Sequence, residues 1–79
     1  MSETIEYKHL LGKARDAKLG GIDAWSCQST GEKIAVALVL NRADWLAEVG
    51  YTMGEAIDRM SPEWLGNIPR VERELRDEG

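Results

Sequence analysis

Cysteine and histidine each occur once in this chain of 79 residues, as Cys27 and His9. A single thiol cannot form a disulfide within the chain, and one thiol with one imidazole cannot supply the usual tetrahedral zinc site. We therefore expect no metal and no cofactor, and a reducing, cytoplasmic setting suits this cysteine content best. Cys27 is expected to be either a small half-buried residue or an exposed thiol that links two copies when it is oxidised.

Long apolar runs and phenylalanine are also missing. The longest apolar run spans residues 34–40, whereas a membrane-spanning helix needs about 20 such residues. The opening residues, MSETIEYK, are polar and acidic and lack the apolar segment of a signal peptide. We expect no membrane association, and we expect Trp25, Trp45 and Trp64 to supply the bulk of the core in place of phenylalanine.

Catalytic signatures are absent as well. The glycines match neither GxGxxG nor GxxxxGK[ST], so no phosphate-binding loop is indicated. His9 is the one imidazole that could act as a base, and helical spacing puts it beside the apolar stripe of the first predicted helix. We interpret it as a surface or packing residue and expect that the protein is not an enzyme.

Positive charge becomes scarce after residue 20. The net charge is −4, and residues 21–60 carry six acidic side chains against three basic ones. A surface of this sign repels nucleic-acid phosphates and favours basic partners.

The residues around which the rest is organised run from Ser29 to Asn41, STGEKIAVALVLN. Ser29 and Glu32 have the spacing of a capping box at a helix start, and seven apolar residues follow Lys33. A helix that is apolar on all sides must be covered on all sides. Alternation within residues 34–40 would also suit a buried strand, but the capping box and the alanines inside the run favour a helix.

The preceding residues, 4–19, form an amphipathic pattern with the apolar stripe Tyr7, Leu10, Leu11, Ala14 and Ala17. We expect Gly20 and Gly21 to end this helix, and Ile22 and Trp25 to cover one end of the core in a single turn. A strand over residues 5–11 is the alternative.

Short capped helices are predicted for the remaining residues. Asn41 can cap a helix with the stripe Trp45, Leu46 and Val49, which Gly50 ends. Thr52 and Glu55 form a second capping box, before the stripe Met53, Ala56, Ile57 and Met60. Ser61-Pro62 opens a turn with Trp64 and Leu65 inside, Gly66-Asn67 ends it, and Pro69 opens the last helix.

These patterns predict an all-α fold: one domain, residues 1–79, built as a compact bundle of four to five short helices around a central hydrophobic helix at about residues 30–40.

Four carboxylates are the candidate partner-binding residues: Asp44, Glu48, Glu55 and Asp58. On helical wheels they lie opposite the apolar stripes of their two helices, so they share one outer surface if those helices are neighbours. Such a surface is either ordinary solubilising charge or a docking face for a basic groove, in which carboxylates stand where phosphates would lie.

Residues 45–60 also have the helix, glycine turn and helix of a DNA-binding helix-turn-helix. The second helix would offer Glu55 and Asp58 outward with Arg59 as its cation, whereas DNA recognition uses Arg, Lys, Asn and Gln. We therefore favour a corner used for packing.

From Gly31 to Trp64 the sequence resembles small proteins of phages and mobile elements in proteobacteria, and in size and acidity it is similar to anti-CRISPR proteins. Anti-CRISPR proteins are phage-encoded inhibitors that bind CRISPR effector complexes, often over a DNA-binding surface. They share no common motif, so no residue's role is carried over.

The resemblance implies an inhibitor in the cytoplasm of a bacterial host, which binds a protein or ribonucleoprotein complex with a basic surface and does not bind nucleic acid directly. Two alternatives remain: a helix-turn-helix regulator, and a small phage assembly or adaptor protein that oligomerises, for instance as a homodimer, through an exposed tryptophan or Cys27.

Overall fold

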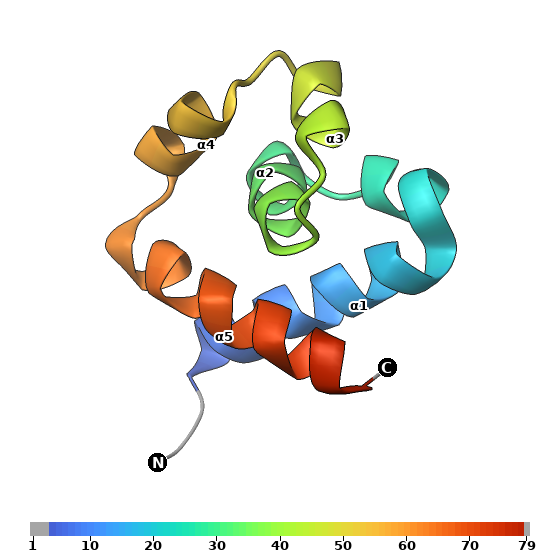
Figure 1. Cartoon of the computed structure of the whole chain (residues 1–79), viewed down its shortest axis with the longest axis vertical. Coiled ribbons are helices and arrows are strands. Elements are labelled where there is room, and N and C mark those ends of the chain that lie inside the picture. The colour runs from blue at the N-terminus through green and yellow to red at the C-terminus, as the bar shows by residue number, and fades with distance from the viewer. Residues whose placement is uncertain (1–3, 79) are drawn as a thin grey trace.

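Residues 4–78, which the computed structural model describes, form five helices and no strand. The helices are α1 (Ile5–Ser26), α2 (Thr30–Val39), α3 (Ala43–Glu48), α4 (Met53–Arg59) and α5 (Pro62–Glu78). Figure 1 shows α2 end-on at the centre, with α1 and α5 along one side of it and α3 and α4 on the other sides. The predicted all-α bundle around a central helix is confirmed.

The central helix α2 begins and is buried as the sequence predicts. The Ser29 hydroxyl accepts a hydrogen bond from the backbone N–H of Glu32 (3.3 Å), and the Glu32 carboxylate accepts one from the backbone N–H of Ser29 (3.0 Å). The side chains that α2 buries come from every side of the helix: Ile34, Ala35, Val36, Ala37 and Val39. The strand alternative for residues 34–40 is therefore wrong.

The first helix, α1, consists of two helical segments joined by a kink. Gly21 takes φ 68° and ψ −157°, a conformation that only glycine adopts without strain. Before the kink, Tyr7, Leu10, Ala14 and Ala17 of the predicted stripe are buried, and Leu11 is half-buried against the core. The strand alternative over residues 5–11 is wrong.

After the kink, Trp25 enters the core and Ile22 does not. The Trp25 ring stacks on the Trp45 ring with centroids 4.9 Å apart, and its indole N–H donates to the carbonyl of Lys33 (2.9 Å). Ile22 is 47% exposed, so the prediction that it covers the core is wrong. The kink redirects the chain, so that the turn after it has only one inward position.

Asn41 ends α2 but does not cap α3. It takes a left-handed conformation with φ 58°, which asparagine tolerates better than most residues. The N-cap of α3 is Arg42, and no side chain caps that helix. Trp45 and Leu46 of the predicted stripe are buried, and Val49 is half-buried. Gly50, which was predicted to end the helix, follows it with φ 79°.

The short helix α4 has the predicted capping box but an incompletely covered apolar stripe. The Thr52 hydroxyl and the Glu55 carboxylate each accept from the other residue's backbone N–H, at 3.1 and 2.9 Å. Only Ala56 of this helix is buried, while Met53 is 38% and Ile57 48% exposed. The helix packs on α2 and α3, so the part of the stripe that faces away from them stays open.

The last helix, α5, is continuous, so the predicted break at Gly66-Asn67 and restart at Pro69 are wrong. Pro69 lies inside the helix and cannot donate to a preceding carbonyl. Asn67 is buried in the turn before it; its side-chain amide donates to the carbonyl of Glu63 (2.9 Å) and accepts from Arg70 (3.2 Å). Packing along α1 and α2 holds the helix together across the proline.

Candidate functional site

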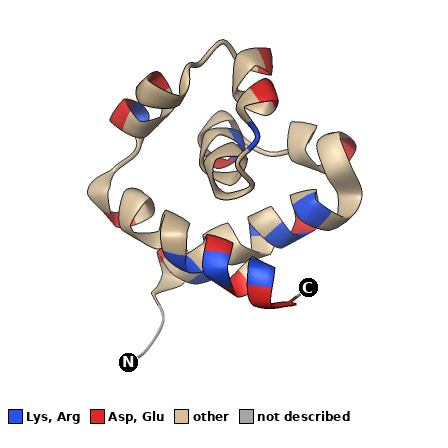
Figure 2. Ribbon diagram, viewed as in Figure 1, with Lys and Arg blue, Asp and Glu red and all other residues tan. Residues whose placement is uncertain are grey.

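The four predicted carboxylates lie on α3 and α4, which we call the acidic corner: Asp44, Glu48, Glu55 and Asp58. Figure 2 shows acidic residues on the outer turns of these two helices, while most lysines and arginines lie on α1 and α5. One pair belongs to each helix, and the connection over residues 49–52 separates the two pairs. All four residues are exposed.

Asp44 differs from the others because an arginine neutralises it. The Arg42 guanidinium donates two hydrogen bonds to its carboxylate, at 3.0 and 2.8 Å, while stacking 4.5 Å above the Trp45 ring. The hydrogen bonds from Arg42 are the main reason that the pKa of Asp44 lies below its ordinary value. A bidentate pair of this kind leaves little free charge for a partner.

The other three carboxylates are more available. One oxygen of Glu55 accepts from the backbone of Thr52, and the carboxylate makes no ion pair with residues 4–78. The side chains of Glu48 and Asp58 make neither a hydrogen bond nor an ion pair within the same residues. The acidic corner thus presents its uncompensated charge mainly through Glu48, Glu55 and Asp58.

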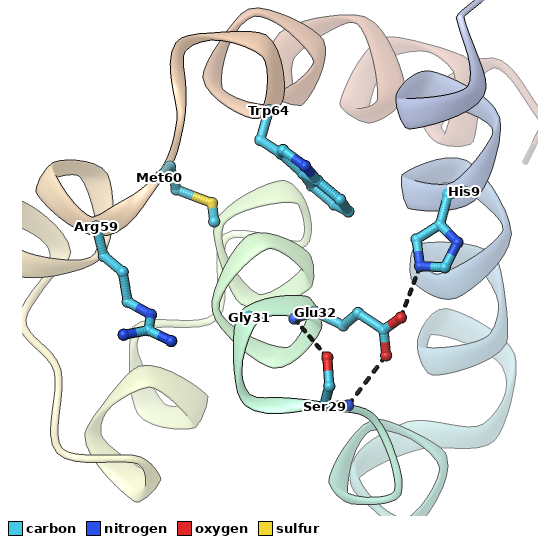
Figure 3. A pocket seen from close by; sticks show the side chains of 7 residues that line it. All are labelled: His9, Ser29, Gly31, Glu32, Arg59, Met60 and Trp64. Atoms are coloured by element: carbon cyan, nitrogen blue, oxygen red, sulfur yellow. Dashed lines mark hydrogen bonds and ion pairs between the residues drawn. The ribbon is translucent and has the colours of Figure 1, made fainter.

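A second feature, which the sequence did not indicate, is a hollow of about 430 Å³ between α1, α2 and the α4–α5 turn, shown in Figure 3. Its lining residues are His9, Ser29, Gly31, Glu32, Arg59, Met60 and Trp64.

Glu32 makes most of the polar contacts in this hollow. Its carboxylate receives the Ser29 backbone N–H on one oxygen and lies 2.6 Å from His9 Nε2 on the other, as Figure 3 shows. Lys13 Nζ lies 3.9 Å from Oε1 of the Glu32 carboxylate. The backbone hydrogen bond from Ser29 is the largest cause of a lowered Glu32 pKa, and His9 and Lys13 act in the same direction. The charged carboxylate therefore ties α1 to the start of α2.

His9 is positioned by packing as well as by Glu32. Its ring meets the Trp64 ring edge-on, with centroids 5.9 Å apart. Among residues 4–78 no group of three His, Cys, Asp or Glu side chains is placed to hold a metal ion. The arrangement is a contact between α1, α2 and α5, which agrees with the interpretation of His9 as a packing residue.

The tryptophans, Cys27 and the helices α3 and α4, on which the two alternative functions depend, have the following positions. Trp25 and Trp45 are buried and Trp64 is half-buried, whereas Cys27 is exposed. Residues 49–52 connect the two short helices α3 and α4. Arg59, the one cation of α4, lines the hollow and lies 5.8 Å from the Tyr51 ring. Within residues 4–78 no helix is both long and apolar enough to cross a membrane.

Comparison with protein families, with curated proteins and with solved structures finds no match for this chain.

Proposed function

We propose that this protein is a non-enzymatic inhibitor of the anti-CRISPR type, encoded by a phage or mobile element. It acts in the host cytoplasm by binding the basic DNA-binding surface of a nucleic-acid-handling complex. The observation that carries the proposal is the acidic corner, where Glu48, Glu55 and Asp58 are exposed and make no ion pair within residues 4–78. The sequence resemblance over residues 31–64 includes this corner.

The mechanism is competition for a surface that normally holds phosphates. Carboxylates on two short helices neutralise part of the partner's arginines and lysines, and the bulk of the bundle then blocks access of DNA. Charge complementarity of this kind speeds association and weakens as salt rises. In this mechanism Asp44 contributes least, because Arg42 already occupies its carboxylate.

The test is a displacement assay. A purified CRISPR effector loaded with guide RNA binds a fluorescent target duplex, and anisotropy reports how much duplex remains bound as the chain is added. We expect release of the duplex in the displacement assay. Direct titration of the chain against the effector without duplex should show weaker binding between about 0.05 M and about 0.5 M NaCl, because exposed charges are screened. If the duplex stays bound across a panel of effector types, the proposal is wrong.

Two variants assign the effect to the acidic corner. The corner variant, Glu48→Lys with Asp58→Lys, reverses two unpaired charges near helix ends where lysine favours the helix dipole. The control variant, Asp23→Lys with Asp77→Lys, makes the same change of net charge at exposed residues of α1 and α5. We expect about 10- to 100-fold weaker displacement by the corner variant only, from two attractive pairs turned repulsive. Glu55 is left unchanged because lysine there would break the capping box.

A further inference from the structure

The hollow beside His9 and Glu32 has the size of a small-molecule site. Its volume of about 430 Å³ lies within the range of about 300–1,000 Å³ that ligand pockets hold. Figure 3 shows the side chains of Arg59, Met60 and Trp64 pointing toward the start of α2, where Glu32 lies. These three residues come from the end of α4, the turn after it and the first turn of α5. One wall of the hollow is therefore the α4–α5 turn, and the other is formed by α1 and α2.

The polar side-chain groups on the wall from the α4–α5 turn are donors without partners. The Arg59 guanidinium carries five N–H groups and makes no hydrogen bond or ion pair within residues 4–78. Its contact is the Tyr51 ring, whose centroid lies 5.8 Å from the guanidinium carbon. The indole N–H of the half-buried Trp64 also donates to no group in this part of the chain. A ligand that binds against this wall must therefore bring hydrogen-bond acceptors.

The two charged side chains in the lining are not equally available to a ligand. The Glu32 carboxylate accepts from the backbone N–H of Ser29, contacts His9 Nε2 at 2.6 Å and has Lys13 Nζ at 3.9 Å. Its charge is largely compensated by these neighbours. Arg59 has no such partner among the described residues. The charge that the lining offers to a ligand is therefore the positive charge of Arg59.

Acidic side chains near the hollow limit the charge that a ligand can carry. Glu55 lies one helical turn before Arg59, Asp58 directly before it, and Glu63 directly before Trp64. None of these three acids lines the hollow or pairs with Arg59. Because the described lining supplies one uncompensated cation, a second negative charge on the ligand would gain repulsion from the acids and no further ion pair. A carboxylate therefore suits the hollow better than a phosphate monoester, which carries up to two charges at neutral pH.

The remainder of the ligand must suit an aromatic ring and a thioether. The Trp64 ring is positioned by its edge-on contact with the His9 ring, with centroids 5.9 Å apart. Met60 lines the same space. Aromatic rings pack favourably against other aromatic rings and against methionine sulfur, so an aromatic body matches this part of the lining.

We propose that the hollow binds a small aromatic monocarboxylic acid. Its carboxylate accepts hydrogen bonds from the Arg59 guanidinium, and its ring packs against Trp64 and Met60. A planar guanidinium binds a carboxylate through two parallel hydrogen bonds, which fixes the orientation of the charged end. The site uses none of the four carboxylates of the acidic corner, so the inference goes beyond the proposed function and is tested separately from it.

Phenylacetate is the probe, and phenylacetamide is a control of the same shape without the charge. Proton–nitrogen NMR spectra follow the indole N–H signal of Trp64, which the Trp64→Phe variant assigns. We expect phenylacetate to shift this signal with a dissociation constant of about 1 mM or lower. The amide should bind about tenfold more weakly, because it forms no charge-assisted hydrogen bond with Arg59. Phenyl phosphate should also bind more weakly than phenylacetate.

Variants assign the binding to Arg59. Arg59→Gln should weaken phenylacetate binding about tenfold, and Arg59→Lys should weaken it less, because lysine keeps the charge but not the planar pair of donors. The matched control is Arg73→Gln, which removes the same charge from an exposed residue of α5 that makes no ion pair within residues 4–78 and does not line the hollow. Its affinity should stay within about twofold of that of the wild-type chain.

A Trp64 signal that stays in place at about 10 mM phenylacetate, about tenfold above the expected dissociation constant, would overturn the inference. So would an amide that binds as tightly as the acid, or an Arg59→Gln variant with unchanged affinity. Tighter binding of phenyl phosphate than of phenylacetate would refute the choice of a carboxylate and assign the hollow to phosphate compounds. The displacement assay contains none of these ligands, so its failure refutes the proposed function and leaves this inference standing.

Discussion

Replacing Glu32 tests how the hollow around His9 holds α1 against α2. Glu32→Ala removes both the acceptor for the Ser29 backbone N–H and the partner of His9. We expect it to lower the free energy of unfolding by about 1–2 kcal/mol, the sum of a lost capping interaction and a lost, half-exposed contact with His9. Glu32→Gln keeps an oxygen for Ser29 but loses the charge, so its expected cost is about 0.5–1 kcal/mol.

Urea unfolding followed by tryptophan fluorescence measures these differences, because Trp25 and Trp45 are buried in the native state. A double-mutant cycle with His9→Ala isolates the energy of the His9–Glu32 pair, for which we expect about 0.5 kcal/mol. If the cycle shows no coupling, then the pair seen in Figure 3 contributes nothing to stability. If Glu32→Gln costs as much as Glu32→Ala, then the oxygen that glutamine keeps for Ser29 contributes nothing.

Three further predictions concern the fold. Gly12→Ala should stabilise the protein by about 0.5–1 kcal/mol, because a Cβ there meets nothing within 4 Å. Gly20→Ala should destabilise it by about 1–3 kcal/mol, because its Cβ would lie 2.6 Å from that of Ala24. Thermal melting should therefore give a higher melting temperature for the first variant and a lower one for the second than for the wild-type chain. Ile34→Ala should cost about 2–5 kcal/mol in urea unfolding because Ile34 is fully buried, and a loss below about 1 kcal/mol would contradict its central place. The lowered pKa of Glu32 means that its share of stability is present above its ordinary value of 4.5 and is lost as pH falls through the folded value, so unfolding between about pH 6 and pH 3 should show a slope that Glu32→Gln reduces.

Local signals in the sequence were enough to predict the helices with caps. The capping boxes of Ser29 with Glu32 and Thr52 with Glu55 lie within one turn, so their formation depends little on the rest of the chain. Burial of all sides of α2 followed from its apolar run.

Features that depend on packing between distant residues were not predictable in this way. The hollow requires His9 and Glu32 to meet across 23 residues of sequence, and no spacing rule reports that. The continuity of α5 defeated the local signals of Gly66 and Pro69, because Asn67 and the contacts with α1 and α2 outweigh them.

For the candidate site, the sequence indicated the four acidic residues but not that one of them, Asp44, is paired with an arginine while the other three are not. Asp44 and Arg42 are only two residues apart, so their pairing could have been predicted from the sequence. The exposure of Ile57 could not be predicted from the sequence, because the apolar stripe of α4 has the spacing of a helix face that packs on the core.

The dissociation constants of the corner and control variants for a guide-RNA-loaded CRISPR effector that the wild-type chain inhibits, measured by calorimetry at low salt, test the central claim most directly. We predict a dissociation constant about 10- to 100-fold higher for Glu48→Lys with Asp58→Lys and an unchanged value for Asp23→Lys with Asp77→Lys. Equal affinities of the two folded variants would show that the acidic corner is ordinary solubilising charge.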